Sequence, residues 1–283
     1  MKWAGQIISK SQSPGLIIEG LWCRALLEFW RGQIKTALET LREAGNLGEK
    51  ISNKNALNFE NFIRGSILFE RGEFESARKY LQACWDWEIR THPLSRELNK
   101  IIYLYELGLI ELALGRTDSA RSRLDEIKAN LVKLGNMLGW NISLNYDFLS
   151  AEILLREGKA KEAIGLLTKL PPERPPLSMG GSLYPIGYAF PALRDVLARA
   201  YQQNGEIDNA IAEYERLVTI GPQNISRALI HPLNYFRLAK LYVQKGATAK
   251  AADNYRRFLD LWKDADPGLP EVEDARKKLA GLS

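Results

Sequence analysis

The sequence predicts an all-α fold, a solenoid of about six helical hairpins followed by a C-terminal capping helix, and three observations predict it. Six glycines, each followed five residues later by an alanine, recur at a nearly fixed spacing among the 283 residues. Successive glycines of this kind are 40, 43, 43, 47 and 41 residues apart. Apolar residues at steps of three and four lie on both sides of each glycine, which is the spacing of an amphipathic helix. A pattern that returns at a nearly fixed period indicates stacked repeats.

Each of these glycines is expected to mark the bend of one hairpin, because glycine adopts the left-handed conformation that ends a helix without steric strain. The pairs are Gly32/Ala37, Gly72/Ala77, Gly115/Ala120, Gly158/Ala163, Gly205/Ala210 and Gly246/Ala251. A small residue stands seven positions before each glycine: Ala25, Gly65, Gly108, Ala151, Ala198 or Ala239. The small residue and the alanine are expected to let the two antiparallel helices of a hairpin approach closely.

The single solenoid is expected to contain its hairpins near residues 16–45, 56–88, 99–130, 142–170, 189–220 and 231–262, with the cap at 270–282. The cap begins at Pro270 and Glu271 and ends with Lys277 and Lys278, a charge order that suits a helix dipole. Residues 2–12 have two interpretations, the tail of a preceding unit's second helix in a longer protein or a short native N-cap. The connection 171–191 is rich in proline and glycine, and it is interpreted either as a loop that contacts a ligand or as a spacer.

Two segments resemble the tetratricopeptide repeat. Residues 194–222 carry Leu197, Ala198, Tyr201, Gly205, Ala210, Tyr214 and Pro222 at the positions that define the family, and residues 235–258 carry Leu238, Ala239, Tyr242, Gly246, Ala251 and Tyr255. Earlier units depart from the pattern, since Glu28 and Glu111 stand where the family prefers an aromatic residue. The resemblance implies a right-handed α-α superhelix. Residues 231–282 are also similar to the ends of such arrays in bacterial signalling proteins with kinase, cyclase or transcription-regulator segments.

The composition is that of a folded, mildly basic protein, with 46% hydrophobic and 26% charged residues and a net charge of +5. No run of Lys and Arg marks a nucleic-acid arm, so a nucleic-acid partner is not expected. No apolar stretch long enough to span a membrane and no signal peptide occur, so a cytoplasmic location is expected. Cys23 and Cys84 are interpreted as buried thiols.

The sequence marks no catalytic, cofactor-binding or metal site. The two histidines, His92 and His231, each precede a proline at a predicted helix entry and are expected to cap helices or pack in loops. No zinc-ligand spacing, phosphate-binding glycine motif or nucleophile motif occurs. The expectation is therefore a protein that is not an enzyme and needs no cofactor.

The resemblance also predicts where a partner binds, because the first helix of each hairpin lines the concave face of such solenoids. The candidate partner-binding residues are Trp22, Phe29, Trp30, Phe62, Phe69, Tyr105, Asn145, Phe148, Arg156, Asp195, Arg199, Gln202 and Lys240. This face is expected to be aromatic in its N-terminal half and polar in its C-terminal half. One interpretation is a peptide groove with an apolar anchor region and a charged selectivity region. The other is that the aromatic residues pack on one another or on a domain upstream.

The principal hypothesis is a scaffold or sensor module of a bacterial signalling protein that binds a protein or peptide partner and packs on an upstream effector domain. The alternative is a small-molecule or lipid sensor that uses the aromatic half. The family's clamp for acidic C-terminal carboxylates needs Lys and Asn in the first unit. Trp22 and Leu26 stand at those places, which argues against a receptor for chaperone tails.

Overall fold

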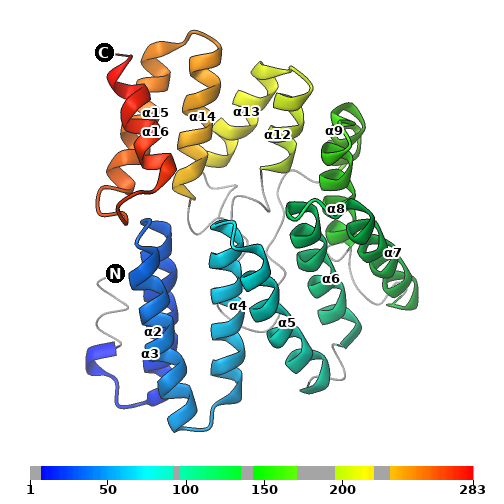
Figure 1. Ribbon diagram of the computed structural model, residues 1–283, viewed down its shortest axis with the longest axis vertical. Coiled ribbons are helices and arrows are strands. Elements are labelled where there is room, and N and C mark those ends of the chain that lie inside the picture. Colours follow the sequence, from blue (N-terminus) through cyan, green and yellow to red (C-terminus); the bar gives the residue numbers. More distant parts are fainter. Residues whose placement is uncertain (1–7, 92–95, 135–142, 171–194, 220–229, 283) are drawn as a thin grey trace. The chain divides into compact units, whose positions relative to one another are not determined.

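Helices form the described part of the chain, and they run in pairs joined by tight bends (Figure 1). The structure is a computed structural model that describes residues 8–91, 96–134, 143–170, 195–219 and 230–282. The pairs are α2 (Pro14–Trp30) with α3 (Ile34–Lys50), α4 (Lys54–Glu70) with α5 (Phe74–Thr91), α6 (Arg96–Ala113) with α7 (Thr117–Leu134), α8 (Ser143–Arg156) with α9 (Ala160–Leu167), α12 (Val196–Gln203) with α13 (Ile207–Val218), and α14 (Pro232–Gln244) with α15 (Thr248–Leu261). A last helix, α16, spans Pro270–Ala280. The all-α prediction is confirmed for the described residues, while the exact limits of the repeats stay a prediction.

The chain divides into two compact units. Unit 1 contains Met1–Pro93 and Leu261–Val272, and unit 2 contains Leu94–Asp260 and Glu273–Ser283. Unit 1 is therefore assembled from two segments of the chain that are far apart in sequence. Helix α16 begins in unit 1 and ends in unit 2.

The six repeat glycines lie at the bends, as the sequence predicts. Gly32, Gly72, Gly115, Gly158, Gly205 and Gly246 have φ angles of 74°, 77°, 77°, 76°, 80° and 74°. At one such bend the Gly205 amide donates to the Gln202 carbonyl at 3.1 Å and the Glu206 amide donates to the Tyr201 carbonyl at 2.9 Å. These bonds satisfy carbonyl groups at the end of α12 that have no partner within the helix. The left-handed glycine thus closes one helix and starts the next.

The small residues seven positions before the bends lie at close helix contacts. Ala25, Ala198 and Ala239 are fully buried. A Cβ atom at Gly65 would lie 2.6 Å from Cγ of Leu81 in α5, and one at Gly108 would lie 2.6 Å from Cδ2 of Leu149 in α8. No side chain fits at these two glycines unless a leucine moves.

Replacing Gly108 by alanine is expected to lower the free energy of unfolding by about 1–3 kcal/mol, because the added methyl group overpacks the α6–α8 contact. Gly165, in α9, provides a matched control because nothing lies within 4 Å of its Cβ position. Alanine there is expected to raise the free energy of unfolding by about 0.5–1 kcal/mol through helix propensity. Urea denaturation of both variants measures the difference. Equal effects of the two substitutions would contradict the close contact at Gly108.

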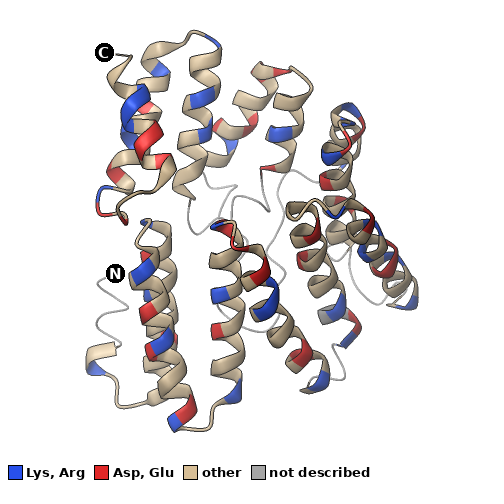
Figure 2. Ribbon diagram, viewed as in Figure 1, with Lys and Arg blue, Asp and Glu red and all other residues tan. Residues whose placement is uncertain are grey.

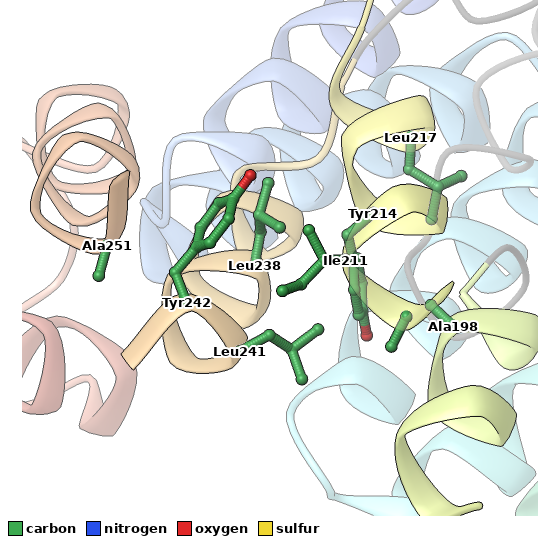
Figure 3. Close-up of a cluster of buried hydrophobic side chains, with 9 residues drawn as sticks. Ala198, Ile211, Tyr214, Leu217, Leu238, Leu241, Tyr242 and Ala251 are labelled. Carbon is green, nitrogen blue, oxygen red and sulfur yellow. The ribbon is translucent and has the colours of Figure 1, made fainter. Parts of the chain in front are cut away.

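The core of the last two hairpins shows how the repeat packs (Figure 3). Tyr214 and Leu217 of α13, Leu238 of α14 and Ala198 of α12 belong to one buried cluster, and all four are at most 3% exposed. Phe236 of α14 continues the contact to α15, with its ring centroid 5.3 Å from that of Phe258. Helix α13 is therefore sandwiched between the first helices α12 and α14, as expected for stacked hairpins.

Glu28 of α2 explains one departure from the tetratricopeptide pattern. It is only 2% exposed, and its carboxylate accepts hydrogen bonds from Nε of Arg24 and from Oγ1 of Thr40 in α3, both at 2.7 Å. A buried carboxylate with two such partners avoids most of the penalty of burial. Glu111, in the same repeat position of α6, is also buried and pairs with Arg116. A polar contact thus replaces the aromatic residue in both hairpins.

Charged residues of both signs are distributed over all the hairpins (Figure 2). Within the described residues, none of the helices has the length and apolar character needed to cross a lipid bilayer.

Candidate functional site

The predicted partner-binding residues fall into three groups by exposure. Phe29, Trp30, Tyr105, Asn145, Phe148 and Asp195 are buried, with exposed fractions of 0–8%. Trp22, Phe62, Phe69 and Arg199 are half-buried, and Arg156, Gln202 and Lys240 are exposed. Only the last two groups present atoms to a partner without rearrangement of the hairpins.

In unit 1 the aromatic residues contact one another. The rings of Trp22 in α2 and Phe59 in α4 have centroids 4.4 Å apart, and those of Phe59 and Phe62 are 6.1 Å apart. Phe62 then meets Trp85 of α5 edge to face at 6.4 Å. This chain of rings supports the interpretation that the aromatic residues of the first hairpins pack on one another.

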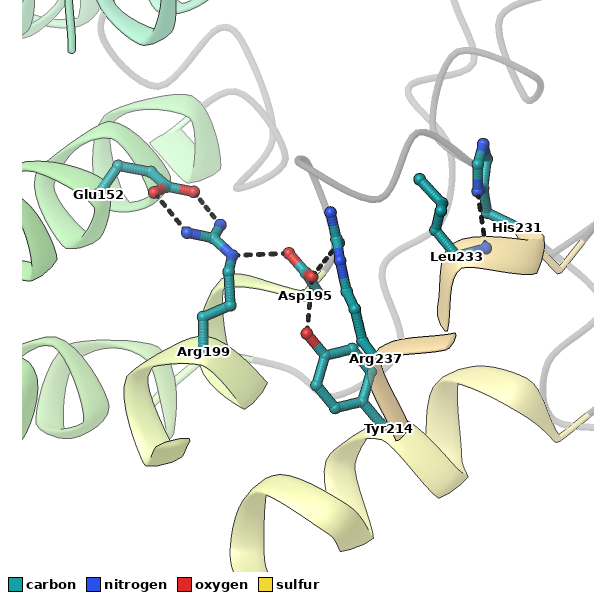
Figure 4. A network of polar contacts seen from close by, with 7 residues as sticks. All are labelled: Glu152, Asp195, Arg199, Tyr214, His231, Leu233 and Arg237. Atoms are coloured by element: carbon teal, nitrogen blue, oxygen red, sulfur yellow. Dashed lines mark hydrogen bonds and ion pairs between the residues drawn. The ribbon is translucent and has the colours of Figure 1, made fainter. Parts of the chain in front are cut away.

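In unit 2 a charged cluster joins three successive first helices (Figure 4). We call it the Asp195 network, and its members are Glu152 of α8, Asp195 and Arg199 at the start of α12, Tyr214 of α13 and Arg237 of α14. Asp195 is fully buried, and its carboxylate accepts from Nε of Arg199 and from the hydroxyl of Tyr214, both at 2.8 Å. Its second oxygen also accepts from the Arg237 guanidinium. Three hydrogen-bond donors from three helices therefore converge on one carboxylate.

Arg199 is held from a second side by Glu152. Its two terminal nitrogens donate to the two Glu152 oxygens at 3.0 and 2.5 Å, a bidentate arrangement. Planar two-point pairing of this kind fixes geometry as well as charge. The Arg199 side chain, 33% exposed, is therefore anchored within the chain and does not offer a free cation to a partner.

The pKa values reflect these contacts. Burial alone would raise the pKa of Asp195, but the charges of Arg237 and Arg199 outweigh it and hold that pKa below its usual value. Burial also works against the charge of Arg199, yet Glu152 and Asp195 raise its pKa well above the ordinary value. For Tyr214, burial and the neighbouring Asp195 charge raise the pKa of the hydroxyl, which remains a donor. Asp195 and Arg199 are therefore both charged.

His231 caps α14 beside this network, as expected from its position before Pro232. It is 2% exposed, and its Nδ1 accepts from the Leu233 amide at 3.3 Å. Burial, assisted by the positive charge of Arg237 and opposed by Asp195, lowers the pKa of His231 to about 3. The imidazole is therefore neutral in the folded chain. His92 lies outside the described residues.

The chain is expected to lose stability between pH 6.5 and pH 4 because of His231. In the unfolded chain this histidine binds a proton near pH 6.5, whereas in the folded chain it stays neutral until about pH 3. The contribution of the neutral His231 to the free energy of unfolding is thus fully present above pH 6.5. It falls as the pH drops, by about 1 kcal/mol from pH 6 to pH 5. Urea unfolding of the wild type and of His231→Asn measures this loss, since asparagine keeps a capping acceptor without titrating. Identical pH profiles for the two proteins would contradict the buried, neutral histidine.

Three first helices of unit 2 carry a charged residue at the same repeat position. The position six residues before the bend glycine holds Glu152 in α8, Arg199 in α12 and Lys240 in α14. Arg156 lies one turn after Glu152, and the Lys240 ammonium lies 5.4 Å from the ring centroid of Phe236. We call the surface made by these three first helices the unit 2 first-helix surface.

Three members of the network, Glu152, Tyr214 and Arg237, were not among the predicted partner-binding residues. Glu152 could have been found from the period, because it occupies the register of Arg199 one hairpin earlier. Arg237 could not have been found from the period, because it is 42 residues from Asp195 and one repeat position out of register with it. Conversely, the network unites only Asp195 and Arg199 among the predicted residues. The loop 171–191 lies outside the described residues.

The carboxylates and guanidiniums of the Asp195 network are paired with one another by hydrogen bonds. Within the part of the chain that the structure describes, no group of three or more His, Cys, Asp or Glu residues could hold a metal ion.

Comparison with known proteins supports the repeat assignment. Residues 193–224 match the sequence model of the tetratricopeptide repeat. A crystal structure of a tetratricopeptide repeat protein from Parabacteroides merdae is similar to this chain with a TM-score of 0.50 and 16% identity, over 99% of this chain and 90% of that one. The TPR2AB domain of yeast Sti1, in a complex with pHSP90, aligns with a TM-score of only 0.34 and 13% identity, over 95% of this chain and 99% of that one. No curated protein sequence matches this chain. The likeness to the Parabacteroides protein supports the fold.

Proposed function

We propose that this chain, a tetratricopeptide repeat protein by fold and by its repeat at residues 193–224, is a non-enzymatic scaffold or sensor module that binds a protein or peptide partner. Repeat solenoids generally serve as protein-interaction modules. We place the partner on the unit 2 first-helix surface and expect it to present an acidic segment. A cytoplasmic location in a bacterial cell and contact with an effector domain upstream complete the proposal.

The choice of surface depends on how the charges of the Asp195 network are paired. Glu152, Arg199 and Arg237 all have their charged groups paired with other members of the network. The side chains of Arg156 and Lys240 remain exposed on the same helices. Two cations on a rigid, internally neutral support favour an acidic ligand, and their attraction extends about 8 Å at physiological salt. The network thus serves as the support and the exposed cations as the contact.

A charge-reversal pair tests this placement. A peptide selected from a display library on the wild-type chain is labelled, and its affinity is measured by fluorescence anisotropy. Replacing Arg156 and Lys240 by glutamate is expected to weaken binding at least tenfold, because two attractive contacts become repulsive. Circular dichroism should show unchanged helical content, since both side chains are exposed.

The matched control reverses the same number of charges on second helices. Lys128 of α7 and Lys161 of α9 are exposed, and their replacement by glutamate changes the net charge equally. This control is expected to bind the peptide as the wild type does. Equal losses in both variants would indicate a general charge effect, and no loss in the first variant would remove the partner from this surface.

The alternative of a small-molecule or lipid sensor finds less support. It requires an accessible aromatic region in the first hairpins, whereas Phe29 and Trp30 are 4% and 5% exposed.

A further inference from the structure

The bend of the first hairpin differs from the other five in being covered. A Cβ atom at Gly32 would lie 2.7 Å from Cβ of Ala265 and 3.0 Å from Cδ2 of Trp262. At Gly158, Gly205 and Gly246 nothing lies within 4 Å, and at Gly72 and Gly115 the nearest atoms are 3.9 and 3.8 Å away. The other five bends of the repeat are thus open at this position, and only the α2–α3 bend among the six is covered.

The cover is residues 261–272, which we call the latch segment, and it belongs to unit 1. The latch segment begins at Leu261, the last residue of α15, and ends in the first turn of α16. Trp262, Leu269 and Val272 are its buried residues, at 4%, 5% and 6% exposed. A buried tryptophan in such a segment has the character of an interface anchor.

The latch segment satisfies backbone groups that the first hairpin leaves open. The Trp262 indole donates to the Trp30 carbonyl at 2.7 Å, across 232 residues of sequence. Trp30 is the last residue of α2, where carbonyl groups have no partner within the helix. The Asp266 amide donates to the Gly32 carbonyl at 3.0 Å. Both bonds cap the end of α2.

The same segment also caps the start of α3. The Asp266 carboxylate accepts from the Lys35 amide at 2.9 Å, in the first turn of α3. The residue that precedes this helix, Gln33, makes no side-chain cap, and the first turn has no acidic residue. Helices α5, α7, α9 and α13 each carry their own acid there: Glu75, Asp118, Glu162 and Asp208. Asp266, 231 residues away in sequence, therefore supplies to the start of α3 the negative charge that these four second helices carry in their own first turns.

We infer that the α2–α3 bend is a peptide-recognition site and that the latch segment is its internal, releasable occupant. The contact consists of one indole anchor that donates to a backbone carbonyl, one backbone–backbone hydrogen bond and one carboxylate at a helix start, which is how a short peptide is bound. The bend and the latch segment are connected only through the rest of the chain, so the latch opens without breaking either helix. Opening exposes the Trp30 and Gly32 carbonyls and the Lys35 amide. This inference does not rest on the proposed function of unit 2.

Hydrogen exchange of the wild-type chain tests whether the latch opens. The Lys35 and Asp266 amides are expected to exchange together, at least tenfold faster than the Ala37 amide, which bonds to the Gln33 carbonyl within the hairpin. They should still exchange more slowly than the amide of Asp208, which occupies the Lys35 position in another hairpin. Exchange of all four amides at one rate, only on global unfolding, would show that the segment is a fixed part of unit 1.

A peptide of residues 259–272, labelled with fluorescein, tests the recognition site on the full chain. A chain with Trp262→Ala and Asp266→Ala has an empty site and is expected to bind this peptide about tenfold more tightly than the wild type, where the latch competes. The control Lys263→Ala with Asp264→Ala changes exposed neighbours in the same segment and should behave as the wild type. Adding Gly32→Ala to the empty-site chain should abolish binding. Equal affinity for the wild-type and empty-site chains overturns the inference, and if the empty-site chain does not fold, the exchange experiment decides.

Discussion

Replacing Asp195 by alanine is expected to lower the free energy of unfolding by about 3 kcal/mol, the lower end of the range for breaking a buried ion pair. The carboxylate is fully buried and accepts from Arg199, Tyr214 and Arg237. Its loss leaves the Tyr214 hydroxyl, which is 1% exposed, without an acceptor. The two arginines are about a third exposed, so water recovers part of their solvation and keeps the effect near the lower limit.

Asp208 offers the matched control for this substitution. Its side chain is 76% exposed and pairs with Lys245 at the surface. Its replacement by alanine is expected to change the free energy of unfolding by at most about 1 kcal/mol. Urea denaturation followed by circular dichroism measures both variants. A loss below 1 kcal/mol at Asp195 would mean that the network contributes little to unit 2.

Replacing Gly32 by alanine is expected to have an effect of similar size, for a different reason. Its φ of 74° is unfavourable for any residue with a Cβ atom, which costs about 1–2 kcal/mol. The new methyl group would also lie 2.7 Å from Cβ of Ala265, and such overpacking costs about 1–3 kcal/mol more. The sum is a loss of about 2–5 kcal/mol.

Gly246 separates the two contributions. It has the same φ of 74°, but nothing lies within 4 Å of its Cβ position. Gly246→Ala is therefore expected to lower the free energy of unfolding by about 1–2 kcal/mol from backbone strain alone. Thermal and urea unfolding of the two variants give the difference. If both substitutions cost the same, the latch segment does not cover the Gly32 bend in solution.

The fold could be predicted because the repeat determines it locally. Gly205 and Ala210 encode a bend and a contact within a dozen residues of sequence, and six copies of the same pattern reinforce one another. The helical hairpins follow from these short-range requirements. The replacement of aromatic residues by Glu28 and Glu111 also has a local explanation, since Arg24 and Arg116 lie four and five residues away.

The contacts of the candidate site depend on longer distances, and for that reason the sequence predicted them only in part. Asp195 and Arg199 are four residues apart on one helix, so their proximity is evident. Arg237 reaches Asp195 from the next hairpin, across a connection whose course the repeat does not specify. Similarly, periodicity identifies aromatic residues on first helices, but burial of Phe29 and Trp30 depends on how neighbouring hairpins pack.

The latch segment also bears on the order in which the protein is made. The Trp30 carbonyl and the Lys35 amide receive their partners from Trp262 and Asp266, which are synthesised 232 and 231 residues later. At about 5–20 residues per second, a ribosome needs roughly 10–50 s to translate that stretch. During that interval the first hairpin has emerged with both helix ends still hydrated. Unit 1 is therefore completed only after the latch segment has been synthesised.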